Sequence, residues 1–170
     1  AHESGSWRDS RLDSEKGWAT YHDENVAGQQ PNTDEGSYFV IDLLQEKLLG
    51  GVATKGANPS SSATGVWTTE YKVEYSLDNT NFTTAIPANP TSNGLFPGNV
   101  DQDTLVESML SAPVSTRYVK IIPIGMSAAA TVPVIRADVI TSVDLGNTKT
   151  LTASDNTLTI SHLKEEIILK

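Results

Sequence analysis

The stretch WTTEYKVEYS, from Trp67 to Ser76, decides the fold. It alternates without a break, and one face carries the larger side chains Trp67, Thr69, Tyr71, Val73 and Tyr75. A period of two with aromatic and β-branched residues on one side indicates a half-buried antiparallel strand. A helix would scatter the same residues around its circumference. The sequence therefore predicts that this strand is the central element of a β-sandwich.

Other short strands are expected before and after this one. They are Ser37–Leu44, Gly51–Lys55, Asn81–Ile86, Thr104–Leu110, Arg117–Pro123 and Val134–Ile140. Turns are expected at Asp78-Asn79 and around Ala112-Pro113. Short strands at this spacing, without a convincing amphipathic helix, predict an all-β sandwich or jelly roll.

The composition narrows the classes of function. The 170 residues include no cysteine, which excludes a disulfide framework and thiolate chemistry. The net charge of −9 argues against nucleic acid and anionic membranes as partners, since both attract Lys and Arg. Neutral sugars, divalent cations and basic proteins remain open as ligands.

Seven sequence blocks follow one another in an order that carries a family resemblance. They are Ser10–Trp18, Tyr38–Leu43, Gly50–Gly56, Trp67–Thr83, Phe96–Thr104, Ala112–Pro123 and Ile135–Ile140. Together they resemble a discoidin domain, the C-terminal domain type of coagulation factors 5 and 8, over about residues 6–140. The resemblance implies a distorted jelly-roll barrel of about eight antiparallel strands, with ligands bound by loops at one end. It also implies buried polar pairing for Arg11, Arg117 and Arg136, and core positions for Trp18 and Trp67.

The resemblance divides the chain into a discoidin-like domain, residues 1–140, and a C-terminal extension, residues 141–170. The cysteines that close most animal members are missing, and only nine residues precede Ser10, so the usual first strand is missing too. Two interpretations of the extension remain open. It packs on the barrel and replaces the lost strand, or it is a linker to another domain.

The ligand-facing loops of the family correspond to His2–Arg8, Tyr21–Gly36 and Gly56–Trp67. Counting from shared motifs, the resemblance to co-receptor domains implies ligand contacts at Asp23, Ser60 and Ser62. A carboxylate flanked by hydroxyls suits a sugar or a guanidinium group. The alternative is that these residues are ordinary solvated loop residues.

Trp7, on the first loop, is the fourth candidate contact. Its ring offers a stacking platform for a pyranose, because the apolar C–H face of a sugar packs on an aromatic face. The alternative is that Trp7 caps the end of the barrel.

Bacterial sugar-binding modules of this fold hold a structural calcium ion in the loop equivalent to Tyr21–Gly36. That implies a calcium site formed by the oxygen ligands Asp23, Asn25, Asn32 and Asp34, although their spacing matches no specific calcium motif. The segment DQDTLVE, Asp101–Glu107, lacks the glycine of a calcium loop and is interpreted as a turn followed by a strand.

No catalytic motif accompanies His2, His22 or His162. The resemblance implies an extracellular adhesion module that binds carbohydrate or glycoprotein, and without a catalytic motif we expect this module to be non-catalytic. The alternatives are an interaction domain for a basic protein and an accessory module of a secreted glycoside hydrolase. Asn81-Phe82-Thr83 is a glycosylation acceptor by sequence.

Overall fold

The computed structural model describes residues 10–14, 17–19, 37–57, 65–128, 130, 133–142, 149–153 and 156–160. All regular secondary structure in these residues is β-strand. The strands are β1 (Trp18–Ala19), β2 (Phe39–Lys55), β3 (Thr68–Ser76), β4 (Thr83–Thr84), β5 (Phe96–Pro97), β6 (Val106–Met126), β7 (Val134–Ser142), β8 (Lys149–Ala153) and β9 (Asn156–Ile160). Over the same ranges, no helix has the length and hydrophobicity needed to cross a membrane.

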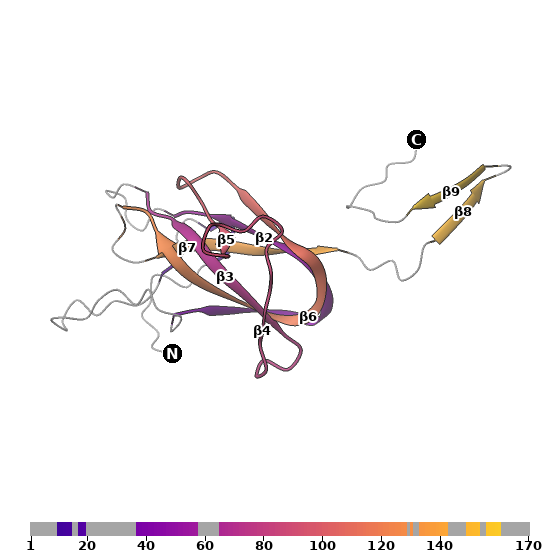
Figure 1. Ribbon diagram of the computed structural model, residues 1–170, viewed down its shortest axis with the longest axis horizontal. Coiled ribbons are helices and arrows are strands. Elements are labelled where there is room, and N and C mark those ends of the chain that lie inside the picture. Colours follow the sequence, from indigo (N-terminus) through magenta and orange to yellow (C-terminus); the bar gives the residue numbers. More distant parts are fainter. Residues whose placement is uncertain are drawn as a thin grey trace.

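Seven strands form one antiparallel sheet in the order β1-β7-β2-β6-β3-β4, with β5 paired to β3. Strand β6 lies between β2 and β3, and β2 also pairs with β7. The sheet closes around its own core as a distorted jelly-roll sandwich (Figure 1). The predicted all-β fold is therefore confirmed.

Strands β2 and β6 are longer than predicted, and each replaces two expected strands. Both curve round at one end of the barrel, so each runs out and back (Figure 1). The register between β2 and β6 shifts from Asp42 to Lys47 and from Leu49 to Gly51, and Leu44 there has a φ of 65°. Such bulges bend a strand without ending it. The predicted turn at Ala112-Pro113 is wrong, because Pro113 lies at a bulge where β6 has no partner residue in β2.

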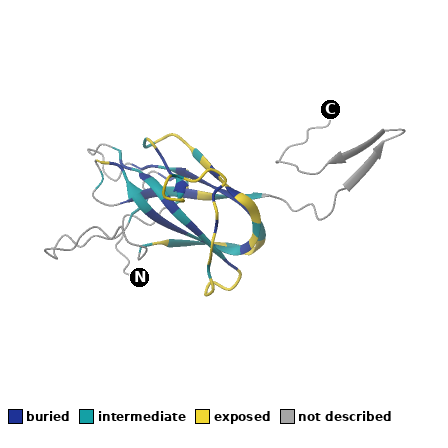
Figure 2. Cartoon of the chain, in the orientation of Figure 1, coloured by how far each residue is buried: buried dark blue, intermediate teal, exposed yellow. Residues whose placement is uncertain are grey.

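The predicted central strand, β3, supplies the centre of the core. Tyr71 and Val73 are fully buried, and the Tyr71 ring stacks on Phe96 with centroids 5.5 Å apart. Figure 2 shows the buried residues running along the strands of the barrel. The predicted alternation is wrong at both ends of the stretch: Thr68 and Ser76 are buried, whereas Thr69 and Tyr75 are only partly buried. At the first end, the pairing of β3 with β6 slips between Thr68 and Glu70.

The two tryptophans predicted to be core residues differ. Trp18 packs against the core, with its ring 5.1 Å from that of Phe39. Trp67 is half-buried and lies outside both core clusters of the described residues. It precedes β3 at the end of the barrel, so only part of its ring area is removed from water.

The turn after β3 confirms the predicted Asp78-Asn79 position. Asn79 has a φ of 59°, a conformation that asparagine tolerates. The strand predicted over Asn81–Ile86 is reduced to Thr83–Thr84, because the side chain of Asp78 binds the backbone of Thr80 and Asn81 and extends the turn.

The C-terminal extension contains the hairpin β8–β9, which forms a separate two-stranded sheet. Residues 143–148 and 161–170 lie outside the described residues. Whether the extension replaces a barrel strand or links to another domain stays a prediction.

Candidate functional site

Two of the predicted ligand loops begin or end at one small apolar cluster. Ala57, Val66 and Val134 are buried together, and Ala19 and Ala130 pack against them. Ala19 lies at the start of segment 20–36, while Ala57 and Val66 stand on either side of segment 58–64. The backbone of Ala57 and Val66 closes that segment through two hydrogen bonds of 2.9 and 3.0 Å. Ala19, Ala57 and Val66, which border these loops, therefore meet at one end of the barrel, which we call the loop pole.

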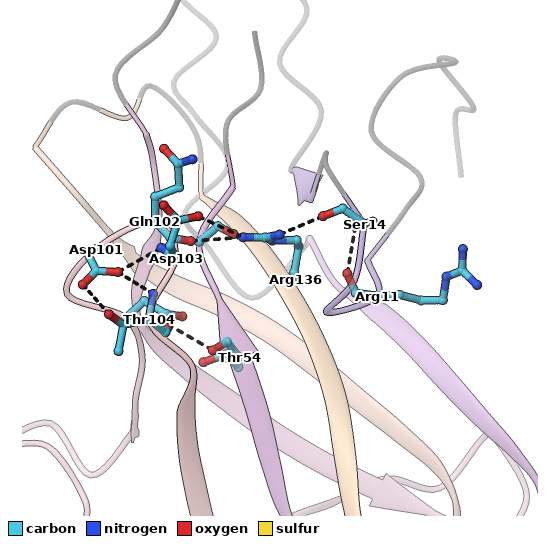
Figure 3. A network of polar contacts seen from close by, with 10 residues as sticks. Arg11, Ser14, Thr54, Asp101, Gln102, Asp103, Thr104 and Arg136 are labelled. Carbon is cyan, nitrogen blue, oxygen red and sulfur yellow. Dashed lines mark hydrogen bonds and ion pairs between the residues drawn. The ribbon is translucent and has the colours of Figure 1, made fainter. Parts of the chain in front are cut away.

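Arg136, on β7, joins three segments at the loop pole (Figure 3). Its guanidinium donates from Nε to Gly56 O at 2.5 Å, from Nη1 to Ser14 O at 2.7 Å and from Nη2 to Gln102 O at 3.1 Å. Its side chain is 11% exposed. The planar guanidinium group has donors pointing in several fixed directions, so one side chain satisfies three backbone carbonyls from different segments.

The base of the first predicted loop is attached at the same place. The backbone N–H of Ala137 donates to Ser10 O at 2.6 Å, and Ser14 caps its own turn by donating to Arg11 O. Strand β1, seven residues further on, pairs Trp18 with Ile135 and Ala19 with Val134 on β7. Strand β7 therefore carries the bases of the first two loops.

A fourth segment, residues 99–104, belongs to the loop pole and was not predicted as part of it. Asp101 accepts hydrogen bonds from the Thr104 hydroxyl and from the backbone N–H groups of Thr104 and Asp103, and these bonds lower its pKa. Asn99 donates to Thr54 O and Thr104 O, at 3.1 and 2.8 Å. This confirms that Asp101–Glu107 is a turn followed by a strand. The sequence signal that could have indicated a turn in this segment was the Gly98-Asn99 pair, just ahead of a turn-forming aspartate.

Close packing at the loop pole requires glycine at position 56. A Cβ there would lie 2.8 Å from the Cα of Gln102, from the Cβ of Trp67 and from Val66 O. The first and third of these atoms are backbone and cannot move aside alone. Gly56 therefore lets the end of β2 pass between segments 65–67 and 99–104.

The three arginines predicted to make buried polar pairs differ in burial. Arg136 is confirmed in that role. Arg117 pairs with Asp42 through two bonds of 2.9 and 3.1 Å, but its side chain is 41% exposed. Arg11 is 74% exposed and lies 3.9 Å from Asp13, so the prediction of a buried pair is wrong there. Arg11 stands in a surface turn that the core does not cover.

Comparison with known proteins agrees with this architecture. The model of the F5/8 type C domain family matches residues 2–137. The chain belongs to the F5/8 type C domain family. The predicted resemblance to discoidin domains is therefore confirmed, with boundaries close to those expected.

Relatives of the chain are found among animal proteins with this domain. Bovine (Bos taurus) lactadherin is 29% identical over 127 residues, which cover 75% of this chain and 29% of lactadherin. Bovine coagulation factor V is 38% identical over 89 residues, which cover 52% of this chain and 4% of factor V. Discoidin II of Dictyostelium discoideum has the same fold, with a TM-score of 0.52 and 22% identity over 81% of this chain and 46% of that chain. The chain thus spans less than a third of the length of these two animal relatives.

The residues predicted to contact ligand fall outside the described part of this F5/8 type C domain. They are Trp7, Asp23, Ser60 and Ser62, and the predicted calcium ligands Asp23, Asn25, Asn32 and Asp34 fall outside it as well. The structure describes only the segments that border them. Among the described residues, no group of three or more His, Asp and Glu side chains is placed to hold a metal ion.

The described part of the loop pole is a rigid support. Several of its polar side chains hold segments together, as the Arg136 and Asp101 contacts show. Beside them, Val100 is 76% exposed, and the side chain of Asp103 is 83% exposed. Such an arrangement fixes the bases of the predicted loops and leaves exposed side chains beside them.

Proposed function

We propose that this F5/8 type C domain is a non-catalytic, extracellular adhesion module that binds carbohydrate or glycoprotein at the loop pole. Trp7 stacks on a pyranose ring, while Asp23, Ser60 and Ser62 bind its hydroxyl groups. The described bases of these segments are already held in place by packing and hydrogen bonds, so fixing them costs no further conformational entropy on association.

One observation carries the proposal. Ala19, at the start of segment 20–36, packs in one apolar cluster with Ala57 and Val66, which flank segment 58–64. The base of segment 1–9 is attached to strand β7, which also pairs with Ala19. Loops that start from one rigid end can contact one ligand together. The chemistry of their side chains, an aromatic ring with a carboxylate and hydroxyls, then favours a neutral sugar.

A glycan array tests the proposal, and it should be run with calcium and with a chelator. We expect retention of a defined set of neutral glycans, and a loss of about tenfold or more in affinity in each of Trp7→Ala and Asp23→Ala. Glu46→Ala, at the exposed bend of β2, is the matched control and should bind as the natural chain does. An array on which no glycan is retained, or binding unchanged in both loop variants, would contradict the proposal.

Calcium is proposed as a structural ion in the segment that holds Asp23, Asn25, Asn32 and Asp34. If it orders that segment, the chelator should weaken glycan binding and lower the Tm, since a bound ion stabilises the state that binds it. Equal Tm values with calcium and chelator would remove calcium from the proposal and leave the sugar contacts to be tested.

A basic protein is the second candidate ligand, and the net charge of −9 is the observation that favours it. Affinity for a neutral sugar should change little with ionic strength, whereas affinity for a basic partner should fall steeply as salt screens the charges. A salt titration of whichever ligand binds therefore separates the two candidates.

A further inference from the structure

Three buried oxygen atoms inside the barrel lack hydrogen-bond partners among the described residues. They are Thr54 Oγ1, Tyr71 Oη and Asn99 Oδ1. Thr54 and Tyr71 are fully buried and Asn99 is 2% exposed. A buried polar atom without a partner costs on the order of 1–3 kcal/mol, and native proteins leave few of them.

These residues come from three elements and meet in one region. Asn99 Nδ2 lies 3.1 Å from Thr54 O, which places the amide of Asn99 beside the end of β2. The hydroxyls of Thr54 and Ser108 also lie close to Tyr71. Burial raises the pKa of Tyr71 to about 12, and these two hydroxyls oppose that rise. Neither, however, forms a well-aligned hydrogen bond with Tyr71 Oη.

The chemistry of the three atoms limits what can satisfy them. Tyr71 keeps its proton at any pH below its pKa and needs an acceptor. Asn99 Oδ1 is a carbonyl oxygen and can only accept, and the two bonds donated by Nδ2 fix which end of the amide it occupies. Thr54 Oγ1 can do both. A water molecule accepts from the hydroxyls and donates to the amide oxygen, and internal waters typically make about three such bonds.

We propose that the barrel interior holds an ordered water molecule bound by Thr54, Tyr71 and Asn99. This water joins β2, β3 and segment 99–104, two residues from the carbonyl of Gly56 that binds Arg136. It therefore reinforces the base of the loop pole from inside. A metal cation suits the place less well, since the three oxygens are neutral and the hydroxyl protons would stay unpaired.

The sign of a stability change tests the proposal in solution. With the water bound, Tyr71→Phe removes one of its partners and should raise the unfolding equilibrium constant by about five- to thirtyfold. In a dry interior the same change would remove a costly unpaired hydroxyl and raise the Tm. Tyr38→Phe, at a residue that is 49% exposed, is the control and should leave the Tm unchanged.

A double variant shows whether the atoms share one water. If they do, Tyr71→Phe combined with Thr54→Val should cost less than the sum of the single changes, because the first change already weakens the same water. Costs that add up fully would contradict a shared water.

A high-resolution crystal structure of the chain gives the direct answer. We expect one density peak within hydrogen-bond distance of all three oxygens. An empty interior, or a peak with the short contacts of a metal ion, would overturn the proposal.

Discussion

At the scale of single residues, two kinds of side chain organise this domain. Aspartates at turns accept backbone N–H groups, as Asp78 and Asp101 do, and one arginine donates to backbone carbonyls. The turn role of the aspartates was predictable, because an aspartate binds backbone two or three residues on. The role of Arg136 followed only from the family resemblance, since its partners are carbonyls that every residue type carries.

The Asp78 turn predicts a pH dependence of stability. Hydrogen bonds from the backbone of Asn81, from its side chain and from Thr80 hold the pKa of Asp78 well below its ordinary value. Ionised Asp78 therefore stabilises the fold above the unfolded-state pKa of about 3.9, and this contribution is lost as the pH falls through the lower folded-state pKa. The Tm of the natural chain should therefore fall between about pH 5 and about pH 2, the range of this titration. The Tm of Asp78→Asn should fall less over the same range.

Thermal unfolding followed by circular dichroism measures this dependence. Glu107→Gln, at an exposed position, is the control and should keep the slope of the natural chain. Identical slopes in the natural chain and in Asp78→Asn would contradict the stabilising role of the turn.

The three bonds of Arg136 lead us to expect that lysine at position 136 destabilises the fold. Arg136→Lys keeps the charge but cannot donate to three carbonyls in separate directions, so we expect a loss of about 2 kcal/mol in the free energy of unfolding. Arg117→Lys, at an exposed ion pair with Asp42, should cost much less. Denaturant unfolding measures both, and equal losses would contradict the role given to Arg136.

At the scale of elements, the sequence pattern did not predict that β2 and β6 are long, bent strands. Gly50-Gly51 and Ala112-Pro113 are typical of loops and turns, yet each lies inside a continuous strand at or beside a bulge. Glycine and proline occur at both turns and bulges, so local composition cannot separate the two. Strand β3 was predictable because its alternation is long and its faces differ.

At Gly56, just after β2, we expect even alanine to destabilise the fold. Gly56→Ala would press a Cβ against the backbone of segments 65–67 and 99–104, and overpacking of this kind costs about 1–3 kcal/mol. Gly50→Ala is the matched control, because its Cβ would meet ordinary contacts of 3.5 and 3.6 Å. A comparison of the two Tm values checks this, and an equal response would contradict the close approach at the loop pole.

In the bend of β2, one substitution is expected to stabilise the fold. Leu44 has a φ of 65° and is 80% exposed, so its side chain adds strain and little burial. Leu44→Asn should stabilise the fold by about 0.5–1 kcal/mol, because asparagine tolerates the left-handed region better than leucine. A Tm that stays level or falls would show that leucine packs more usefully there than its exposure indicates.

At the scale of the whole molecule, the barrel directs several segments toward one end. The family and the fold were predictable from ordered blocks spread along the chain, and the model match to residues 2–137 bears this out. The proposed ligand contacts Trp7, Asp23, Ser60 and Ser62 stay predictions. Composition alone could not locate the segment 99–104, because its place at the loop pole depends on contacts with residues distant in sequence.

Site-directed blocking of single positions tests whether the ligand is recognised at the loop pole. The chain has no cysteine, so a single introduced cysteine can carry a bulky label at one chosen position. Ligand retention on the glycan array is then measured with the label at Asp23→Cys, at Ser62→Cys and at Glu46→Cys in the bend. We predict that retention is lost with either loop label and kept with the label at the bend. Retention kept with both loop labels and lost with the label at the bend would contradict recognition at the loop pole.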